Sequence, residues 1–199
     1  MTGTSPDSLR ICVYCASSRS CDPLYHDAAR RLGALIAGRS WSIVYGGGGD
    51  GSMGALAAGA LSAGGRVTGV IPRFMMELEW AHAGLSDLRV VDDMRTRKHI
   101  MITGSDAVVA LPGGSGTLEE LFEAITLKRL GMYLKPIVIV NMNGFYDPLL
   151  GQLSRCVGER FMDAQHTAMW TAVDSVDEVI GAITAAPAWG SDARTFARV

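Results

Sequence analysis

Short apolar segments alternate along the chain with longer segments in which apolar residues recur at a helical period. The apolar segments have the length of β-strands and occupy Ile11–Cys15, Ser42–Tyr45, Arg66–Ile71, Leu88–Val91, Ala107–Leu111, Pro136–Val140 and, more weakly, Ala168–Val173. The segments between them predict helices over Asp22–Ala37, Gly51–Ala63, Met94–Thr103, Gly116–Leu130, Tyr146–Val157 and Ser175–Thr184. Strands that alternate with helices of this length are typical of βαβ units and a parallel sheet.

Several of the strand segments, such as "AVVAL" and "PIVIV", are apolar throughout, as strands covered on both faces are. The pattern therefore predicts a doubly wound α/β fold, a mostly parallel Rossmann-like sheet with helices on both faces. Residues 10–185 contain no linker and no fixed-period repeat, so we expect them to form a single nucleotide-binding domain. We expect the polar segments 1–9 and 187–199 to be flexible tails.

The composition narrows the classes of function. The chain has 199 residues, of which 48% are hydrophobic, and a net charge of −2, which disfavours nucleic-acid binding by bulk charge. Glycines and charged residues interrupt every apolar run before it reaches membrane-spanning length. The opening "MTGTSPDSL" has no apolar core of a signal peptide, so we expect a cytoplasmic protein without membrane partners.

Cys12 and Cys15 have the C-x-x-C spacing that occurs in metal and redox sites. They lie in a predicted strand, however, where side chains three residues apart point to opposite faces. No second Cys/His pair completes a zinc site. We therefore expect buried core thiols, no metal and no cofactor.

Three loops directly follow predicted strands: "CASSRS", "YGGGGDGSMG" and "LPGGSGT". Doubly wound sheets bind their ligands at the carboxyl ends of the strands, which is where these loops lie. The second loop contains G-x-G-x-x-G, the glycine motif of dinucleotide-binding sites. In those sites the motif follows the first strand and the next strand ends in an acidic residue, whereas here it follows the second strand and no such acidic residue is present. It also lacks a P-loop lysine. Its glycines, Gly47 and Gly48 among them, either allow a nucleotide to approach the backbone or only let helix and strand pack closely. The first interpretation is favoured.

In the third loop, Gly113, Gly114 and Gly116 precede a predicted helix, whose N-terminus favours an anion such as phosphate. Thr117 can add a hydroxyl donor. Glutamates follow at once, and they either face water at the helix start or include one carboxylate that acts on the ligand. Glu120 is the candidate, because it lies three residues after Thr117 on the same helix face.

The segments "PGGSGTLEE" and "MRTRKHIM" resemble two motif blocks of the LONELY GUY family, the first of them P-G-G-x-G-T-x-x-E. "YGGGGDGSMG", "ELEWAHAGL" and "GFYDPLL" resemble further blocks, so that the resemblance extends over about residues 10–175. It implies hydrolysis of the N-glycosidic bond of cytokinin riboside 5′-monophosphates, or of AMP in relatives, to free base and ribose 5-phosphate. The chain departs from the family at "TLKRLG", where relatives read "TWAQLG", and at "CASS", where "CGSS" is common.

By position, the resemblance implies that Arg97 and Glu120 are catalytic. The implied substrate-binding positions are Glu79, Lys98, Thr126 and the loop residues Gly113, Gly114, Ser115, Gly116, Thr117, Leu118 and Glu119. The chemistry agrees, because a carboxylate can stabilise an oxocarbenium-like ribose and orient water. An arginine can hold phosphate or hydroxyl groups and assist the leaving base.

Two other classes of function stay open at this point, a nucleotide-binding module without chemistry and a nicotinamide-dependent oxidoreductase. A pyridoxal-phosphate decarboxylase is disfavoured, because no lysine lies in a Schiff-base context. The resemblance also implies a homodimer. Leu127, Leu130, Met132 and Tyr133 form a second apolar surface, which either packs against a second copy or folds back on the core of its own domain.

Overall fold

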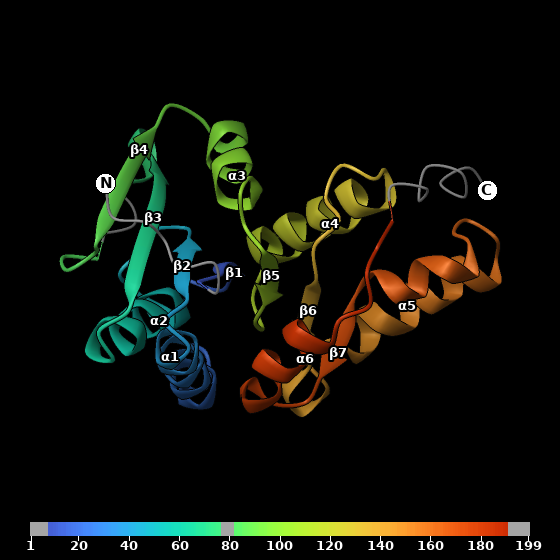
Figure 1. Ribbon diagram of the computed structural model, residues 1–199, viewed down its shortest axis with the longest axis horizontal. Coiled ribbons are helices and arrows are strands. Elements are labelled where there is room, and N and C mark those ends of the chain that lie inside the picture. The colour runs from blue at the N-terminus through green and yellow to red at the C-terminus, as the bar shows by residue number, and fades with distance from the viewer. Residues whose placement is uncertain (1–7, 77–81, 191–199) are drawn as a thin grey trace.

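The computed structural model describes residues 8–76 and 82–190 of the chain. Within them, seven strands form one parallel sheet in the order β4-β3-β2-β1-β5-β6-β7 (Figure 1). The strands are β1 (Arg10–Tyr14), β2 (Ser42–Tyr45), β3 (Arg66–Pro72), β4 (Asp87–Val91), β5 (Ala107–Ala110), β6 (Ile137–Val140) and β7 (Thr171–Val173). The helices are α1 (Pro23–Gly38), α2 (Gly51–Ser62), α3 (Met94–Ile102), α4 (Ser115–Arg129), α5 (Asp147–Gly158) and α6 (Val179–Ala185). No helix of this part of the chain is long and apolar enough to cross a membrane.

Helices cover both faces of the sheet, as the continuous apolar strands predict. In the view of Figure 1, α3 and α4 lie above β5, and α1 and α2 lie below β2. α6 belongs to the same apolar cluster as α1 and α2. Side chains of β1 alternate between two apolar clusters, with Ile11 and Val13 in one and Cys12 and Tyr14 in the other. Cys15 belongs to the cluster of Ile11, so the two cysteines of the C-x-x-C spacing are buried on opposite faces. The prediction of core thiols is confirmed.

The predicted elements at the carboxyl end of the chain are longer than those of the structure. Residues Ala164–Met169 form a 3₁₀ turn rather than the start of a strand. Asp163 caps this turn, because its side chain accepts from the Gln165 N–H and its own N–H donates to His166 Nδ1. Ser175 caps another 3₁₀ turn just before α6, which therefore begins at Val179.

The segment after α6, which the sequence predicts to be flexible from residue 187, contacts the domain at Trp189. The indole Nε1 donates a hydrogen bond of 3.1 Å to the Lys128 carbonyl, and the Lys128 ammonium lies 5.6 Å from the centre of the indole ring. Lys128 is buried, and burial lowers its pKa to about 8. The indole thus covers a buried lysine at the start of the segment 187–199, and the flexibility expected of that segment stays a prediction.

The order of the strands places three loops side by side. β1 lies between β2 and β5, and the direction of chain progress through the sheet reverses at β1. The loops that follow β1, β2 and β5 are therefore neighbours at the carboxyl edge of the sheet, where open α/β sheets bind ligands. They are the three loops that the sequence singled out.

Two glycines allow α1 and α2 to pack closely beside β2. A methyl group on Gly59 of α2 would lie 2.0 Å from the Arg30 carbonyl oxygen, and one on Gly33 of α1 would lie 2.2 Å from that of Leu56. Real Cβ atoms do not approach backbone atoms so closely, so either substitution would push the helices apart.

We therefore expect Gly59→Ala to lower the free energy of unfolding by roughly 1–3 kcal/mol, the usual cost of overpacking a core. Urea unfolding followed by circular dichroism measures this. Gly151→Ala is the matched control, because Gly151 lies inside α5 and a methyl group there would meet nothing within 4 Å. The control is expected to be neutral or to stabilise by up to about 1 kcal/mol. Equal stability of the two variants would contradict the packing argument.

Candidate active site

A cavity of about 340 Å³ opens at the carboxyl edge of the sheet, beside the ends of β1 and β5. It is lined by Cys15, Ala16, Ser17, Ser18, Met53, Met75, Met94, Arg97, Gly114, Ser115, Gly116, Thr117, Glu119 and Glu120. Its volume lies in the range of small-ligand sites. The cavity brings together the predicted catalytic pair, Arg97 from α3 and Glu120 from α4, with most of the glycine loop.

One end of the cavity is the N-terminus of α4, and its geometry suits an anion. Gly114 is the N-cap residue, and no side chain caps the helix. The first N–H groups of α4 are therefore available to a ligand, and the helix dipole favours a negative charge there. A methyl group on Gly114 or Gly116 would meet nothing within 4 Å, so packing inside the protein does not require glycine at these positions. Open space above the loop leaves room for a ligand.

Gly113 has a different role in the same loop. A methyl group on it would lie 2.2 Å from Thr117 Oγ1, so glycine is needed for the threonine side chain to fold back over the turn. Thr117 is buried and lines the cavity. The loop thus combines one glycine that positions a hydroxyl with two that leave the backbone accessible.

Glu120 lies one helical turn after Thr117 and is 6% exposed. Burial raises the pKa of its carboxyl to about 7, while the positive charge of Arg97 opposes this rise. A carboxyl that titrates near neutral pH can act as a general base or acid at physiological pH. The burial and the neighbouring arginine make Glu120 the strongest candidate for chemistry in the cavity.

Arg97 is 3% exposed. Two backbone carbonyls hold its guanidinium, one within β3 and one just after β2. Its Nε donates to the carbonyl of Val70 in β3 at 3.1 Å, and its Nη2 donates to the carbonyl of Gly46, just after β2, at 2.9 Å. Nη1 contacts the sulfur atoms of Met75 and Met94, at 3.8 and 3.7 Å. The Nη1 atom of the guanidinium therefore faces residues that line the cavity, whereas Nε and Nη2 form hydrogen bonds with the backbone.

Lys98 and Thr126, two predicted substrate-binding residues, lie outside this cavity. Lys98 forms ion pairs with Glu119 and Glu123, the second at 3.1 Å, and so ties α3 to α4. Lys98 and Thr126 line a shallow groove on the outer surface of the two helices, together with Glu119, Phe122, Glu123 and Leu127. Glu119 lines both the groove and the cavity. Within one chain, the predicted site is thus divided between the two.

The remaining predicted residues contact the protein itself. Gly47 and Gly48 are buried and do not line the cavity, and the Gly48 carbonyl accepts from the Tyr45 hydroxyl at 3.0 Å. Leu118 is partly buried against the apolar cluster of α3 and α4. Glu79 lies outside the described residues.

The cavity also contains residues that the sequence did not single out. Ser17 and Ser18 follow β1, and their place in a loop at the reversal of strand order was the available signal. Met53 and Met94 are on the cavity wall because they lie in the first turns of α2 and α3. Isolated methionines in an apolar segment give no sequence signal of this kind.

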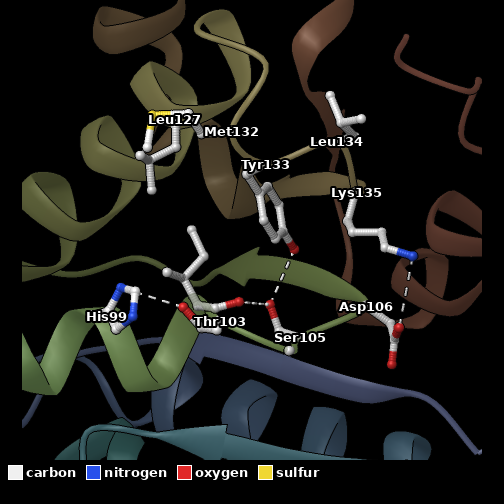
Figure 2. A pocket seen from close by; sticks show the side chains of 11 residues that line it. His99, Thr103, Ser105, Asp106, Leu127, Met132, Tyr133, Leu134 and Lys135 are labelled. Atoms are coloured by element: carbon white, nitrogen blue, oxygen red, sulfur yellow. Dashed lines mark hydrogen bonds and ion pairs between the residues drawn. The ribbon is translucent and has the colours of Figure 1, made fainter. Parts of the chain in front are cut away.

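A larger cavity of about 460 Å³ lies at the opposite edge of the sheet, before β5 and β6 (Figure 2). Its lining includes the apolar side chains of Ile102, Leu127, Met132, Tyr133 and Leu134. The Tyr133 hydroxyl lies 3.2 Å from Ser105 Oγ, and Lys135 lies 3.9 Å from Asp106. This cavity holds none of the predicted catalytic or substrate-binding residues.

Comparison with known proteins identifies relatives of the whole region that forms the site. A family model described as "Possible lysine decarboxylase" matches residues 53–183. The probable cytokinin riboside 5′-monophosphate phosphoribohydrolase LOGL1 of rice is 40% identical over 171 residues, covering 86% of this chain and 77% of the rice protein. LOG1 of Arabidopsis thaliana, named as the same enzyme, is 39% identical over 86% of this chain and 80% of its own length. The rice protein LOG is 43% identical over 77% of this chain, which corresponds to 63% of LOG.

Solved structures share the fold at lower identity. The molybdenum cofactor carrier protein of Chlamydomonas reinhardtii superimposes with a TM-score of 0.69 at 23% identity, over 89% of this chain and 96% of that protein. The molybdenum cofactor binding protein of Rippkaea orientalis gives a TM-score of 0.69 at 24% identity, over 90% and 98%. These similarities support the Rossmann-like fold alone. The family model and the relatives near 40% identity show that the chain belongs to the LONELY GUY family, as its motif blocks predict.

Proposed function

We propose that this protein hydrolyses the N-glycosidic bond of cytokinin riboside 5′-monophosphates and releases the free base and ribose 5-phosphate. The observation that carries the proposal is the arrangement of one cavity. The uncapped N-terminus of α4 forms one end, and buried Glu120 follows a single helical turn later, beside buried Arg97. The relatives named above carry this activity in their names. AMP is a secondary candidate substrate.

The arrangement assigns a role to each part of the substrate. The 5′-phosphate accepts hydrogen bonds from the N–H groups of the α4 N-terminus and from Thr117. The ribose then lies beside Glu120, whose carboxylate stabilises the positive charge that develops as the bond from C1′ to the base breaks. The bonding electrons leave with the base, which gains a proton, and water adds to C1′. The charge of Arg97 favours the departing base.

We propose further that two chains form a dimer through the outer surface of α3 and α4. The four residues that the sequence predicts to form a second apolar surface differ in their exposure. Tyr133 is buried and Leu127 is partly buried, so these two fold back on the core. Leu130 and Met132, by contrast, are 44% and 67% exposed. A second copy that covers these residues and the cavity of Figure 2 would also approach the groove of Lys98 and Thr126. The cytoplasmic location stays a prediction from the sequence.

The proposed function requires a 5′-phosphate on the substrate. We expect kcat/KM for isopentenyladenosine 5′-monophosphate to exceed that for isopentenyladenosine by about 10²-fold or more, because the nucleoside loses two or more charge-assisted hydrogen bonds of roughly 1.5–3 kcal/mol each. Chromatography of the free base measures both rates, with AMP as a third substrate. Equal kcat/KM with and without the phosphate would contradict the role of the α4 N-terminus, and no release of base would contradict the proposed function.

Glu120→Gln keeps the shape of the side chain and removes its charge. We expect kcat to fall by roughly 10²–10⁴-fold, the range for a general acid–base group, while the nucleotide still binds.

In the wild type, kcat/KM should rise with pH through about 7 as the Glu120 carboxyl of the free enzyme ionises. The pH profile of the remaining activity of the variant should lack this rise. The charges that act on Glu120 are those of Arg97, Lys98, Glu119 and Glu123. Turnover near that of the wild type would show that Glu120 only starts the helix.

The same variant has an effect on stability that does not depend on the substrate. The pKa of Glu120 rises from 4.5 to about 7 on folding, so its favourable contribution is present below pH 4.5 and is lost as the pH rises through 7. At pH 8 the wild type must keep a buried charge, and Glu120→Gln should be more stable by roughly 1–3 kcal/mol. Urea unfolding at pH 5 and pH 8 measures the difference, which should be smaller at pH 5.

The dimer is tested by placing a charge on its proposed surface. Because two-fold symmetry introduces the change twice, Met132→Asp should weaken the dimer by at least ~30-fold, corresponding to about 2 kcal/mol. Activity should fall with it, since the groove of Lys98 and Thr126 adjoins this surface. Phe161→Asp is the control, an exposed aromatic residue beyond α5. Sedimentation velocity measures the mass, and a fully active wild-type monomer at micromolar concentration would exclude the dimer.

A further inference from the structure

The glycine-rich segment after β2 does not line the proposed site, but its Gly46 lies against two side chains that do, those of Arg97 and Met53. We infer that Gly46 is a positioning residue, whose carbonyl and missing side chain together hold the Arg97 guanidinium at the cavity. The inference rests on the proposed function and goes beyond it, because Gly46 does not line the cavity itself. The segment "YGGGG" then positions the charge of Arg97, whereas the interpretation favoured from the sequence was direct contact of this segment with a nucleotide.

The arginine lies closest to the space around Gly46, and Met53 borders it as well, with its Cε 3.1 Å from an added methyl group. A methyl group on Gly46 would lie 2.2 Å from Arg97 Nη2 and 3.3 Å from Cζ. The φ angle of Gly46 is one that other residues adopt, unlike that of Gly47 at +85°. Glycine is therefore needed at position 46 for space, and the atom that needs this space belongs to the proposed catalytic arginine.

Two backbone carbonyls hold the arginine in its position. Its Nε is bonded to Val70 in β3 while its Nη2 is bonded to Gly46, so adjacent strands of the sheet fix the plane of the guanidinium. The group is 3% exposed, and carbonyl dipoles compensate its buried charge. A side chain at position 46 would break the bond to the Gly46 carbonyl and move the charge relative to Glu120. Displacements of about 1 Å at such a group can cost ~10²-fold in rate.

The test is a double-mutant cycle of Gly46→Ala with Arg97→Lys. Lysine lacks Nη2, and its ammonium reaches about as far as Cζ, so the added methyl group has little to displace. We expect Gly46→Ala to lower kcat by ~10²-fold in the wild type with KM changed less than ~3-fold. In the Arg97→Lys background the further loss of kcat should be under ~3-fold. Gly38→Ala, where a methyl group meets nothing within 4 Å, is the control and should retain wild-type activity.

The cycle has a second readout that needs no turnover. Gly46→Ala should lower the midpoint of thermal unfolding by at least ~4 °C more in the wild type than in Arg97→Lys, because the closest contact of the methyl group, with Arg97 Nη2, is present only in the wild type, while the contact with Met53 is common to both. If the wild type shows no turnover, the proposed function fails while the thermal cycle still tests the contact. If Gly46→Ala alone does not fold, Arg97→Lys should restore folding.

Three results would overturn the inference. Equal loss of kcat or of thermal stability in both backgrounds would mean that Gly46 acts independently of Arg97. A rise in KM at unchanged kcat would mean that the glycine segment contacts the substrate directly. Failure of Arg97→Lys to restore folding of an unfolded Gly46→Ala variant would mean that the backbone, and not the guanidinium, requires the glycine.

Discussion

The carboxyl of Glu120 is 6% exposed, and at neutral pH its burial as an anion is unfavourable by itself. Burial raises its pKa to about 7, and Arg97 and Lys98 of α3 act against this rise. Burial is the main cause of the shift, and the position of α3 against α4 determines how far the two positive charges counteract it. The ion pairs of Lys98 with Glu119 and Glu123 hold the two helices in that position. A residue predicted to bind substrate thus also supports the electrostatics of the site from outside the cavity.

Similar glycine-rich motifs serve different physical purposes in the two loops. After β2, a side chain on Gly46, Gly51 or Gly54 would collide with Arg97, with the Ser18 carbonyl or with the Gly49 backbone. These glycines are required by contacts inside the protein. After β5, Gly114 and Gly116 have open space around them. The letters G-x-G-x-x-G do not distinguish these cases, because the distinction depends on which side chain the fold brings to each turn.

The sequence predicted the fold because strands buried on both faces and helices with one apolar face leave distinct patterns. The family resemblance of its motif blocks also implied that Arg97 and Glu120 belong to one site, and both residues line one cavity. It could not show that Lys98 points to the outer groove, since neighbouring residues of a helix face directions about 100° apart and the rotation of α3 depends on packing. Nor could it place Met53 and Met94, which reach the cavity only through the order of the strands. Trp189 lay in a polar segment, and only the buried Lys128 beneath it explains its position.

α4 connects the cavity of Arg97 and Glu120 with the cavity of Figure 2. Its N-terminus forms the proposed phosphate site, and Leu127, near its carboxyl end, lines the cavity of Figure 2. A helix of 15 residues spans roughly 22 Å, so Met132, beyond the carboxyl end of α4, and the cavity at the N-terminus of α4 lie near opposite ends of this length. In the proposed dimer, the second copy would approach the site along the groove of Lys98 and Thr126 on α3 and α4. Glu119 lies in that groove and in the cavity of Arg97 and Glu120, and it is ion-paired to Lys98. If the proposed dimer covers the groove, this glutamate is therefore the described residue that links the dimer surface most directly to the proposed active site.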